Sequence, residues 1–298
     1  MMWKKHGMVL LTVCLAVLAG RAVAQKGKTG APQWQAVLLR KATGFNVPEC
    51  VLVDPAGQLV YISNIEAEKD QYWTNDGKGF ITQMGLDGLV KKPRWLNSAP
   101  NAVINAPKGM CILKARLYFS DNARLLWTPL DGADPPKEIP LAGAQQLNDL
   151  ATDGLSVYVS DTAQGVVYKV DEKGGSTKLE APEGVNGLTC HQGRLFAVSW
   201  TLHEVYELDP TGIEAPKPFG LAGHFSNLDG IEVLDDGTFL VSDFTGNKVS
   251  AITPDRKSVY TLAELESPAD IGVDRANGKL YVPQFMKNQV AALKLQAP

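Results

Sequence analysis

Short apolar runs alternate with turn residues along most of this 298-residue chain. Val, Ile, Leu and Tyr fill the runs, and Gly, Asp, Asn and Pro separate them, which is typical of short β-strands joined by tight turns. We find no helical period of any length from Trp34 to the C-terminus. The pattern therefore predicts an all-β protein.

One strand–turn–strand unit recurs six times, at intervals of about forty residues. Each copy has an apolar strand, a turn, and a second strand that ends in a small and a polar residue. The copies span residues 47–64, 106–121, 146–161, 184–200, 227–243 and 267–284. Two further short strands follow in each repeat, and four short strands in about forty residues form one blade of a β-propeller. The repeats predict a six-bladed β-propeller.

The two ends of the repeat array complement each other. The last copy is followed by a strand near residues 290–295 and no fourth strand, whereas residues 34–40 (WQAVLLR) form a spare strand before the first copy. We expect this N-terminal strand to complete blade six and close the ring, because closure hides sheet edges. The predicted domain covers residues 34–298, after a flexible lead-in at residues 25–33.

One spacing departs from the repeat. The first two copies are about sixty residues apart, and the excess lies in residues 65–79 (IEAEKDQYWTNDGKG). Long insertions in a regular array often lie on the functional face. Tyr72 and Trp73 favour a lid over the central opening, and a tolerated surface insertion is the alternative.

Residues 1–24 have the pattern of a secretory signal peptide. Lys4 and Lys5 precede an apolar stretch from Met8 to Gly20, and residues 22–24 (AVA) form a small-x-small cleavage site. The apolar stretch is shorter than the roughly 20 residues of a spanning helix. We expect cleavage after this site and a secreted or periplasmic protein without membrane attachment. An N-terminal membrane anchor is the alternative.

Charge and cysteine content limit the partners. Loss of residues 1–24 would remove Lys4, Lys5 and Arg21 and no acid, which lowers the net charge from −3 to −6. Because no basic block remains, nucleic acid and anionic membranes are not expected partners, and we expect a monomer that acts on a small molecule. The remaining cysteines occupy the same strand of different repeats and are expected to be buried thiols, with a single disulfide as the alternative: Cys50, Cys111 and Cys190.

Comparison of the copies singles out the residue that opens the first strand of each blade. First strands line the central channel of a propeller, so these six residues should lie at one end of it. The position reads Glu49, Lys108, Asn148, Asn186, Asp229 and Ala269. Buried charges at such a place need partners or a metal ion. The Glu, Asp and two Asn offer oxygen ligands, which suit Ca²⁺, with Mg²⁺ or Mn²⁺ as alternatives, and are poor ligands for zinc.

These four residue types, in blades one, three, four and five, resemble the regucalcin/gluconolactonase family. Diisopropylfluorophosphatase and the paraoxonases share its six-bladed architecture. The matching motifs are PEC with Glu49, LND with Asn148, VNGL with Asn186 and LDGI with Asp229. The phrase NAPKGM (105–110) resembles bacterial secreted members. The resemblance covers nearly the whole mature chain. It implies that the four side chains hold one catalytic divalent cation and that the protein hydrolyses lactones or phosphotriester-like esters.

The residues suit metal-assisted hydrolysis, in which a divalent cation polarises a carbonyl or phosphoryl oxygen and lowers the pKa of a bound water. Asp229 is the first candidate for general base or nucleophile, and Glu49 is the second. In the alternative interpretation these residues line the channel of a non-catalytic propeller.

Lys108 departs from a cation-binding set, because an ammonium beside a cation is unfavourable. Two hypotheses follow. Lys108 points slightly away and binds a substrate carboxylate or stabilises an oxyanion. Alternatively, it replaces the cation and pairs with Glu49 and Asp229.

Four other residues are candidates for the mouth of the channel. Trp200 and Gln284 stand where other copies end their second strand in Ser-Asp, and they are expected to determine specificity or simply to pack. His203 and His224 lie in connections near the mouth, and His224 is a candidate proton shuttle or a loop histidine without a catalytic role. The repeated Ser-Asp pairs are expected to bond turn backbone through Asp121, Asp161 and Asp243.

The leading hypothesis is thus a secreted or periplasmic, divalent-metal-dependent hydrolase of the gluconolactonase type, acting on a small and anionic substrate. The alternative is a non-catalytic propeller that binds a small anionic ligand or a protein. A third hypothesis is a metal-free enzyme on this scaffold, similar to the strictosidine synthase-like branch.

Overall fold

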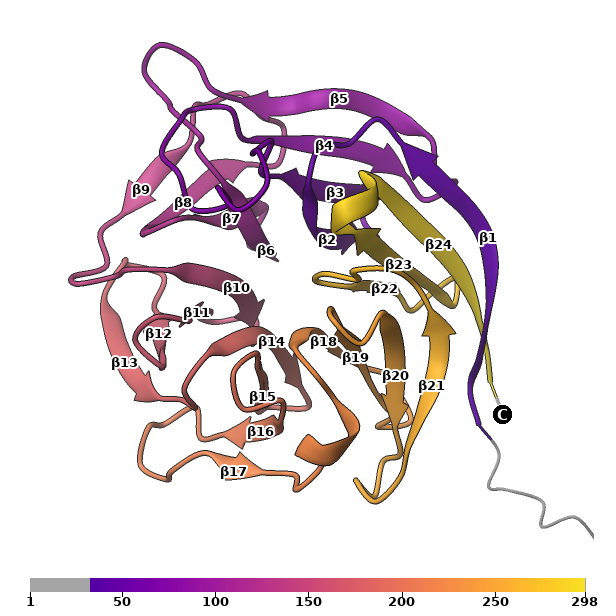
Figure 1. Ribbon diagram of the computed structural model, residues 1–298. Coiled ribbons are helices and arrows are strands. Elements are labelled where there is room, and N and C mark those ends of the chain that lie inside the picture. The colour runs from indigo at the N-terminus through magenta and orange to yellow at the C-terminus, as the bar shows by residue number, and fades with distance from the viewer. Residues whose placement is uncertain (1–32, 298) are drawn as a thin grey trace, which may run out of the picture. The chain divides into compact units, whose positions relative to one another are not determined.

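A computed structural model describes residues 33–297 of the chain and shows six four-stranded antiparallel sheets arranged in a ring (Figure 1). The prediction of a six-bladed β-propeller is confirmed. In each blade the first strand lies nearest the centre of the ring and the fourth lies at its rim (Figure 1). The predicted signal peptide, its cleavage site and nearly all of the lead-in lie outside the described residues.

The first three blades follow the predicted repeats. Blade 1 contains β2 (Pro48–Asp54), β3 (Leu59–Asn64), β4 (Phe80–Gly85) and β5 (Val90–Asn97). Blade 2 contains β6 (Pro107–Leu113), β7 (Arg116–Asp121), β8 (Arg124–Pro129) and β9 (Lys137–Ile139). Blade 3 contains β10 (Leu147–Thr152), β11 (Val157–Asp161), β12 (Val166–Val170) and β13 (Ser176–Glu180).

The second half of the ring repeats this plan and adds two short 3-10 helices. Blade 4 contains β14 (Val185–His191), β15 (Arg194–Ser199), β16 (Val205–Leu208) and β17 (Lys217–Pro218), and is followed by η1 (Ala222–His224). Blade 5 contains β18 (Leu228–Val233), β19 (Phe239–Asp243), β20 (Lys248–Ile252) and β21 (Val259–Glu264). Blade 6 contains β22 (Gly272–Asp274), β23 (Lys279–Gln284), β24 (Gln289–Gln296) and β1 (Gln35–Thr43), with η2 (Phe285–Lys287) between β23 and β24. None of the helices in residues 33–297 has the length and apolar character needed to cross a membrane.

The ring closes at both its outer and its inner edge. At the rim, β1 pairs antiparallel with β24 from Gln35–Gln296 to Thr43–Gln289, which confirms the predicted closing strand and extends it beyond residue 40. At the centre, the backbone of Asp270 bonds to blade 1. Its N–H donates to the Glu49 carbonyl at 2.9 Å, and its carbonyl accepts from the Val51 N–H at 3.1 Å. These bonds hold the first and last blades together beside the channel.

The core is divided among the interfaces between blades. Each neighbouring pair of blades shares one cluster of buried apolar side chains, so the described ring has six such clusters. In the cluster between blades 4 and 5, for example, the rings of Phe196 and Phe239 meet edge to face with centroids 5.0 Å apart. Because apolar burial is the main driving force of folding, every blade depends on both of its neighbours.

We expect a protein that begins at residue 44 to melt about 10 °C below one that begins at residue 33. Removal of β1 eliminates the β1–β24 backbone hydrogen bonds, each worth roughly 0.5–1.5 kcal/mol, and about 1 kcal/mol shifts the melting temperature of a large domain by 2–4 °C. Thermal denaturation of the two truncated proteins tests this expectation. Equal melting temperatures would show that β1 contributes nothing to closure.

Candidate functional site

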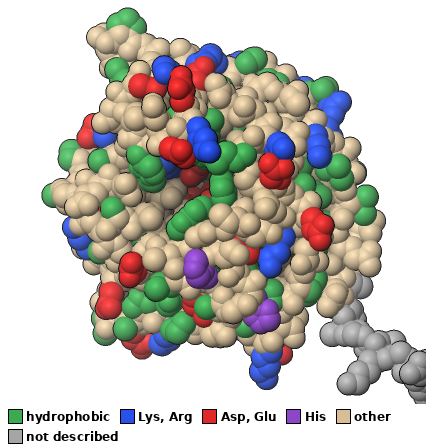
Figure 2. All heavy atoms as spheres, viewed as in Figure 1, with side chains coloured by type: hydrophobic (Ala, Val, Ile, Leu, Met, Phe, Trp, Pro, Cys, Tyr) green, Lys and Arg blue, Asp and Glu red, His purple; other side chains and the backbone are tan. Residues whose placement is uncertain are grey.

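A cavity of about 350 Å³ lies at the centre of one face of the ring, and we call it the mouth. Figure 2 shows hydrophobic side chains gathered around a central hollow, with acidic side chains visible inside it. Each of the polar residues that the repeats singled out is the second residue of an inner strand and lines the mouth: Glu49, Lys108, Asn148, Asn186 and Asp229. The structure therefore brings the five together. The sixth position, Ala269, is fully buried in an apolar cluster that also contains Phe285.

A β-bulge sits at each of these five positions. The register between the first and second strands shifts around Glu49, Lys108, Asn148, Asn186 and Asp229. A bulge redirects side chains and leaves a backbone group without its usual partner in the sheet. In blades 1, 3 and 5 a serine hydroxyl of the second strand accepts the backbone N–H of the residue that follows Glu49, Asn148 or Asp229. The distances are 2.9, 2.9 and 2.7 Å for Ser63, Ser160 and Ser242. The repeated serine thus supports the bulge.

The aspartate of each repeated Ser-Asp pair has the predicted structural role. The Asp121 carboxylate accepts the backbone N–H of Asn105 and of Ala106, both in the connection that enters its own blade. Asp161 and Asp243 accept the equivalent backbone N–H groups in blades 3 and 5. These carboxylates fix the connection immediately before the residue that lines the mouth.

The two acids of the mouth are buried and incompletely paired. Glu49 is 5 % exposed and Asp229 is 6 % exposed, and within the described residues neither Glu49 Oε2 nor Asp229 Oδ1 has a hydrogen-bond partner. Burial raises the pKa of Glu49 well above its usual value, and the charge of Asp229 raises it further. Burial, together with the charge of Asp149, raises the pKa of Asp229 to about 8.

The two acids and the two asparagines of the mouth fit a divalent cation. Unpaired buried carboxylate oxygens are costly, and a cation placed between them would offset both the desolvation and the mutual repulsion. Two carboxylates and two amide oxygens form the ligand chemistry that hard cations such as Ca²⁺ prefer. The residues that would hold it are Glu49, Asn148, Asn186 and Asp229.

Lys108 is directed toward the inserted loop. Its Nζ donates to the carbonyl oxygens of Tyr72 and Ala106, at 3.0 and 3.1 Å, and to Asn122 Oδ1 at 3.3 Å. It also lies 3.7 Å from the centroid of the Trp73 ring. Burial lowers its pKa to about 8, although the charge of Glu49 opposes this shift. The ammonium protons thus go to protein acceptors, and neither predicted role, substrate binding or replacement of the cation, accounts for these contacts.

The inserted loop, residues 65–79, lies over the mouth and reaches two other blades. Asn122 of blade 2 donates through Nδ2 to the Thr74 carbonyl at 3.0 Å and to Asn75 Oδ1 at 2.7 Å. The Tyr72 ring packs edge to face against Phe285 of blade 6, with centroids 4.8 Å apart. Tyr72 and Trp73 both line the mouth. We call this segment the lid loop.

We expect Lys108→Met to accelerate hydrogen exchange in the lid loop by roughly tenfold or more, because the variant loses three hydrogen bonds and a cation–π contact. Calcium affinity should rise several-fold, because a positive charge near Glu49 is removed. Exchange mass spectrometry and calorimetry measure the two effects. Lys78→Met, at an exposed position of the same loop, is the control. Exchange as slow as in the unsubstituted protein would remove Lys108 as an anchor of the lid loop.

The remaining predicted mouth residues divide into two groups. Trp200 lines the mouth. Gln284 is buried, and its side chain donates to the Glu266 carbonyl and accepts from Gln289, so it packs within blade 6. Neither histidine is among the lining residues: His224 is exposed at the end of η1, and His203 is half-buried, with no partner for its Nδ1 in the described part of the chain.

The predicted alignment of blade 4 was wrong by one residue. Ser199 pairs with Val185 just as Asp161 pairs with Leu147, so Val198 and Ser199 occupy the Ser-Asp position and Trp200 follows it. The residues that follow the second strands form a further ring, of which the sequence predicted only Trp200 as a mouth residue: Ile65, Asn122, Thr162, Trp200, Phe244 and Phe285. All except Asn122 line the mouth, and Asn122 holds the lid loop. Comparison of the copies one position farther along would have revealed this ring.

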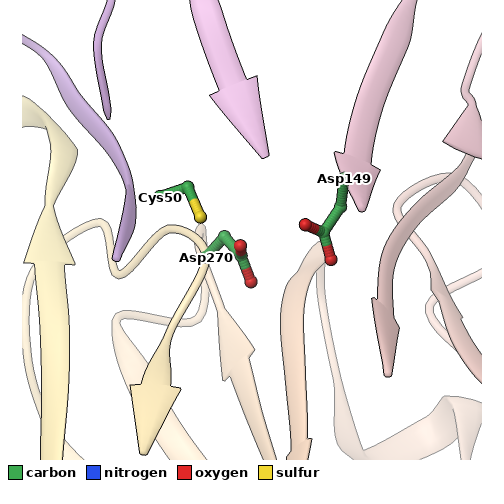
Figure 3. Close-up of side chains that lie close together, drawn as sticks. All are labelled: Cys50, Asp149 and Asp270. Carbon is green, nitrogen blue, oxygen red and sulfur yellow. The ribbon is translucent and has the colours of Figure 1, made fainter. Parts of the chain in front are cut away.

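A second group that could hold a metal ion lies one residue deeper in the channel. One ligand atom from each of Cys50, Asp149 and Asp270 lies within 4.8 Å of the others, and Figure 3 shows the three side chains facing one another. All three residues line a separate cavity of about 510 Å³. Burial raises the pKa of the Cys50 thiol and that of Asp270. The sequence signal for this group is an acid immediately after the compared position in two of the six copies, Asp149 and Asp270.

Asp149 also has a structural role. Its Oδ1 accepts the Leu150 N–H and its Oδ2 accepts the Leu188 N–H, both at 2.6 Å, and the second bond joins blade 3 to blade 4. The three cysteines of the described residues are free; Cys50 and Cys111 are buried as expected, whereas Cys190 is only half-buried.

Comparison with known proteins supports the fold. No family model matches the sequence, and no curated protein matches it. Among solved structures, a protein assigned provisionally as a gluconolactonase is similar over 89 % of this chain and 93 % of its own, with 18 % identity and a TM-score of 0.66. An inactive virginiamycin B lyase from Staphylococcus aureus, solved with quinupristin, is similar over 88 % of this chain and 99 % of its own, with 15 % identity and a TM-score of 0.60.

A nidogen/laminin complex contains a third similar chain, with 17 % identity and a TM-score of 0.61 over 72 % of this chain and 85 % of that chain. Identities this low show a common architecture and leave function to the site. One of these neighbours is named as a lyase and another is part of a protein complex. The chain shares the six-bladed propeller fold with all three.

Proposed function

We propose that the protein is a divalent-cation-dependent hydrolase that cleaves lactones or esters at the mouth. One observation carries the proposal: two buried acids with unpaired oxygens, Glu49 and Asp229, line one small-molecule-sized cavity together with Asn148 and Asn186. The solved gluconolactonase-like structure supports it as a neighbour in fold. Calcium is the cation proposed, with magnesium and manganese as alternatives.

When bound, the cation supplies Lewis-acid polarisation of the substrate carbonyl oxygen. Asp229 is the proposed general base, because it lines the mouth and its Oδ1 has no hydrogen-bond partner within the described residues, so it is placed to take a proton from the attacking water. The water oxygen then forms a bond to the carbonyl carbon, the bond to the leaving oxygen breaks, and Asp229 returns the proton to that oxygen. Glu49 balances the charge of the site and is the second candidate for the base.

The lid loop is proposed to exclude water from the mouth during this reaction. Lys108 and Asn122 hold it from blade 2, and Phe285 supports Tyr72 from blade 6. Removal of bulk water strengthens the electrostatic interactions inside a site. On this proposal Lys108 is a positioning residue.

The test is a calcium titration by calorimetry after chelator treatment, followed by a screen of lactones and esters with and without the cation. One bound calcium per chain and hydrolysis that stops on chelation would support the proposal. One bound calcium without any hydrolysis would favour the alternative, a propeller that binds a ligand. The five aromatic residues that line the mouth are the observation in favour of that alternative: Tyr72, Trp73, Trp200, Phe244 and Phe285.

We further propose export, on the basis of the signal-peptide pattern in residues 1–24. The mature protein would then act as a monomer outside the cytoplasm, without nucleic-acid or membrane partners. Mass spectrometry of the protein from the culture medium or periplasm tests this, because cleavage after Ala24 predicts an N-terminus at Gln25.

A further inference from the structure

Four aromatic rings form a continuous wall on one side of the mouth. Tyr72 packs against Phe285, Phe285 against Phe244, and Phe244 against Trp200, with centroid separations of 4.8, 5.5 and 5.4 Å. All four line the mouth, and they come from the lid loop and from blades 6, 5 and 4. We call them the aromatic arc. A wall of this kind offers apolar surface to a ligand and few hydrogen bonds.

The polar groups of the mouth outside the cation set are mostly occupied. The Lys108 ammonium donates to three protein acceptors. The Thr162 hydroxyl donates to the Val185 carbonyl at 2.7 Å. Gln146 also lines the mouth. A polyhydroxylated or anionic ligand would lose water here and find few partners in return.

We propose that the substrate carries an uncharged alkyl or aryl group beside the reacting carbonyl, and that the aromatic arc selects it. The proposal rests on the proposed function, because the carbonyl must face Glu49 and Asp229 while the apolar group lies against the arc. It excludes sugar lactones as good substrates. The proposal also replaces the anionic substrate expected from the sequence, because binding an anion would require a Lys108 ammonium that is not already bonded to protein acceptors.

The first test compares lactones that differ only in apolar length. We expect kcat/KM to rise roughly threefold to fourfold for each methylene from γ-butyrolactone to γ-hexalactone and γ-octalactone, as each becomes buried against the arc. Glucono-δ-lactone should be at least about 100-fold poorer than γ-octalactone. A preference for glucono-δ-lactone, or equal kcat/KM for all of the γ-lactones, would overturn the proposal.

Trp200→Ala tests the arc itself. The variant should lose roughly 10- to 100-fold in kcat/KM for γ-octalactone, mainly through KM, and less than about threefold for γ-butyrolactone. Trp200→Phe should retain most of the discrimination. The control is Leu202→Ala, because Leu202 lies in the same connection and is 39 % exposed without lining the mouth. Calcium affinity should stay unchanged in all three variants. An equal loss for both lactones in Trp200→Ala would contradict selection by the arc.

A binding experiment separates failure of this inference from failure of the proposed function. 3-Hexylcyclopentanone has the shape of an alkyl γ-lactone and cannot be hydrolysed. We expect the protein to bind it at least tenfold more tightly than cyclopentanone, and Trp200→Ala to abolish the difference. If no lactone or ester is hydrolysed, this result would still establish the selectivity of the mouth. Equal affinity for the two ketones would refute it even in an active enzyme.

Discussion

Replacement of Asp229 by asparagine should weaken calcium binding by more than about 100-fold and lower any hydrolysis by roughly 10²–10⁴-fold. The substitution keeps the shape of the side chain and removes one of the two charges that the cation would balance. It also removes the proposed base. Calorimetry measures the first effect and a lactonase assay under saturating calcium measures the second.

The same variant should fold at least as well as the unsubstituted protein when calcium is removed. Asp229 is buried with an unpaired oxygen and a pKa raised to about 8, so a neutral amide at this place matches its protonated form below that pH and avoids the desolvation cost of the carboxylate above it. Asp235→Asn is the control, because Asp235 lies in the same blade and its side chain is 84 % exposed. Unchanged calcium affinity in Asp229→Asn would show that the cation binds elsewhere, with the Cys50, Asp149 and Asp270 group as the next candidate.

Calcium affinity should rise by up to about tenfold per pH unit for each competing proton between about pH 6 and 8 and then level off. Burial and neighbouring charge raise the pKa of Asp229 to about 8 and also raise that of Glu49, so below pH 8 a proton competes with the cation for the same oxygens. Calorimetric titrations at pH 6, 7, 8 and 9 measure this dependence. Equal affinity at pH 6 and pH 8 would contradict proton competition.

The calcium-free protein should show the opposite trend in stability. The pKa of Asp229 is raised on folding from about 3.8, so the native state binds more protons than the unfolded state. The stabilisation from its protonated form is complete below about pH 4 and is lost as the pH rises through about 8. The melting temperature of the chelated protein should therefore fall toward pH 9, and calcium should restore it. Asp229→Asn should show a smaller fall, and Asp235→Asn should behave as the unsubstituted protein.

The architecture could be predicted from the sequence because a propeller repeats one local pattern. Alternation of apolar runs and turn residues defined the strands, and six copies at a near-constant interval defined the blades. The spare strand near residues 34–40 was recognisable because the last repeat lacked a partner, and β1 pairs with β24 as expected. Blade 4 was misaligned by one residue because Val198 and Ser199 break the Ser-Asp pattern there.

The five polar positions of the mouth were also recognisable, since equivalent positions of a closed ring must lie together. The contacts that these side chains make depend on the tertiary structure. The sequence did not show that Lys108 turns toward the Tyr72 and Ala106 carbonyls, because a long side chain on a strand can reach several partners. His224 is close to Asp229 in the chain, yet it ends η1 as an exposed residue outside the lining of the mouth.

By itself, then, the sequence determined the six blades, the closing strand and the five polar positions of the mouth, because each follows from a repeated local pattern. The tertiary structure alone decided which side chains surround those positions. The aromatic arc joins the lid loop to three different blades, and the lid loop is held by a fourth. Contacts between residues so far apart in the chain depend on how the blades pack, and no local pattern encodes them.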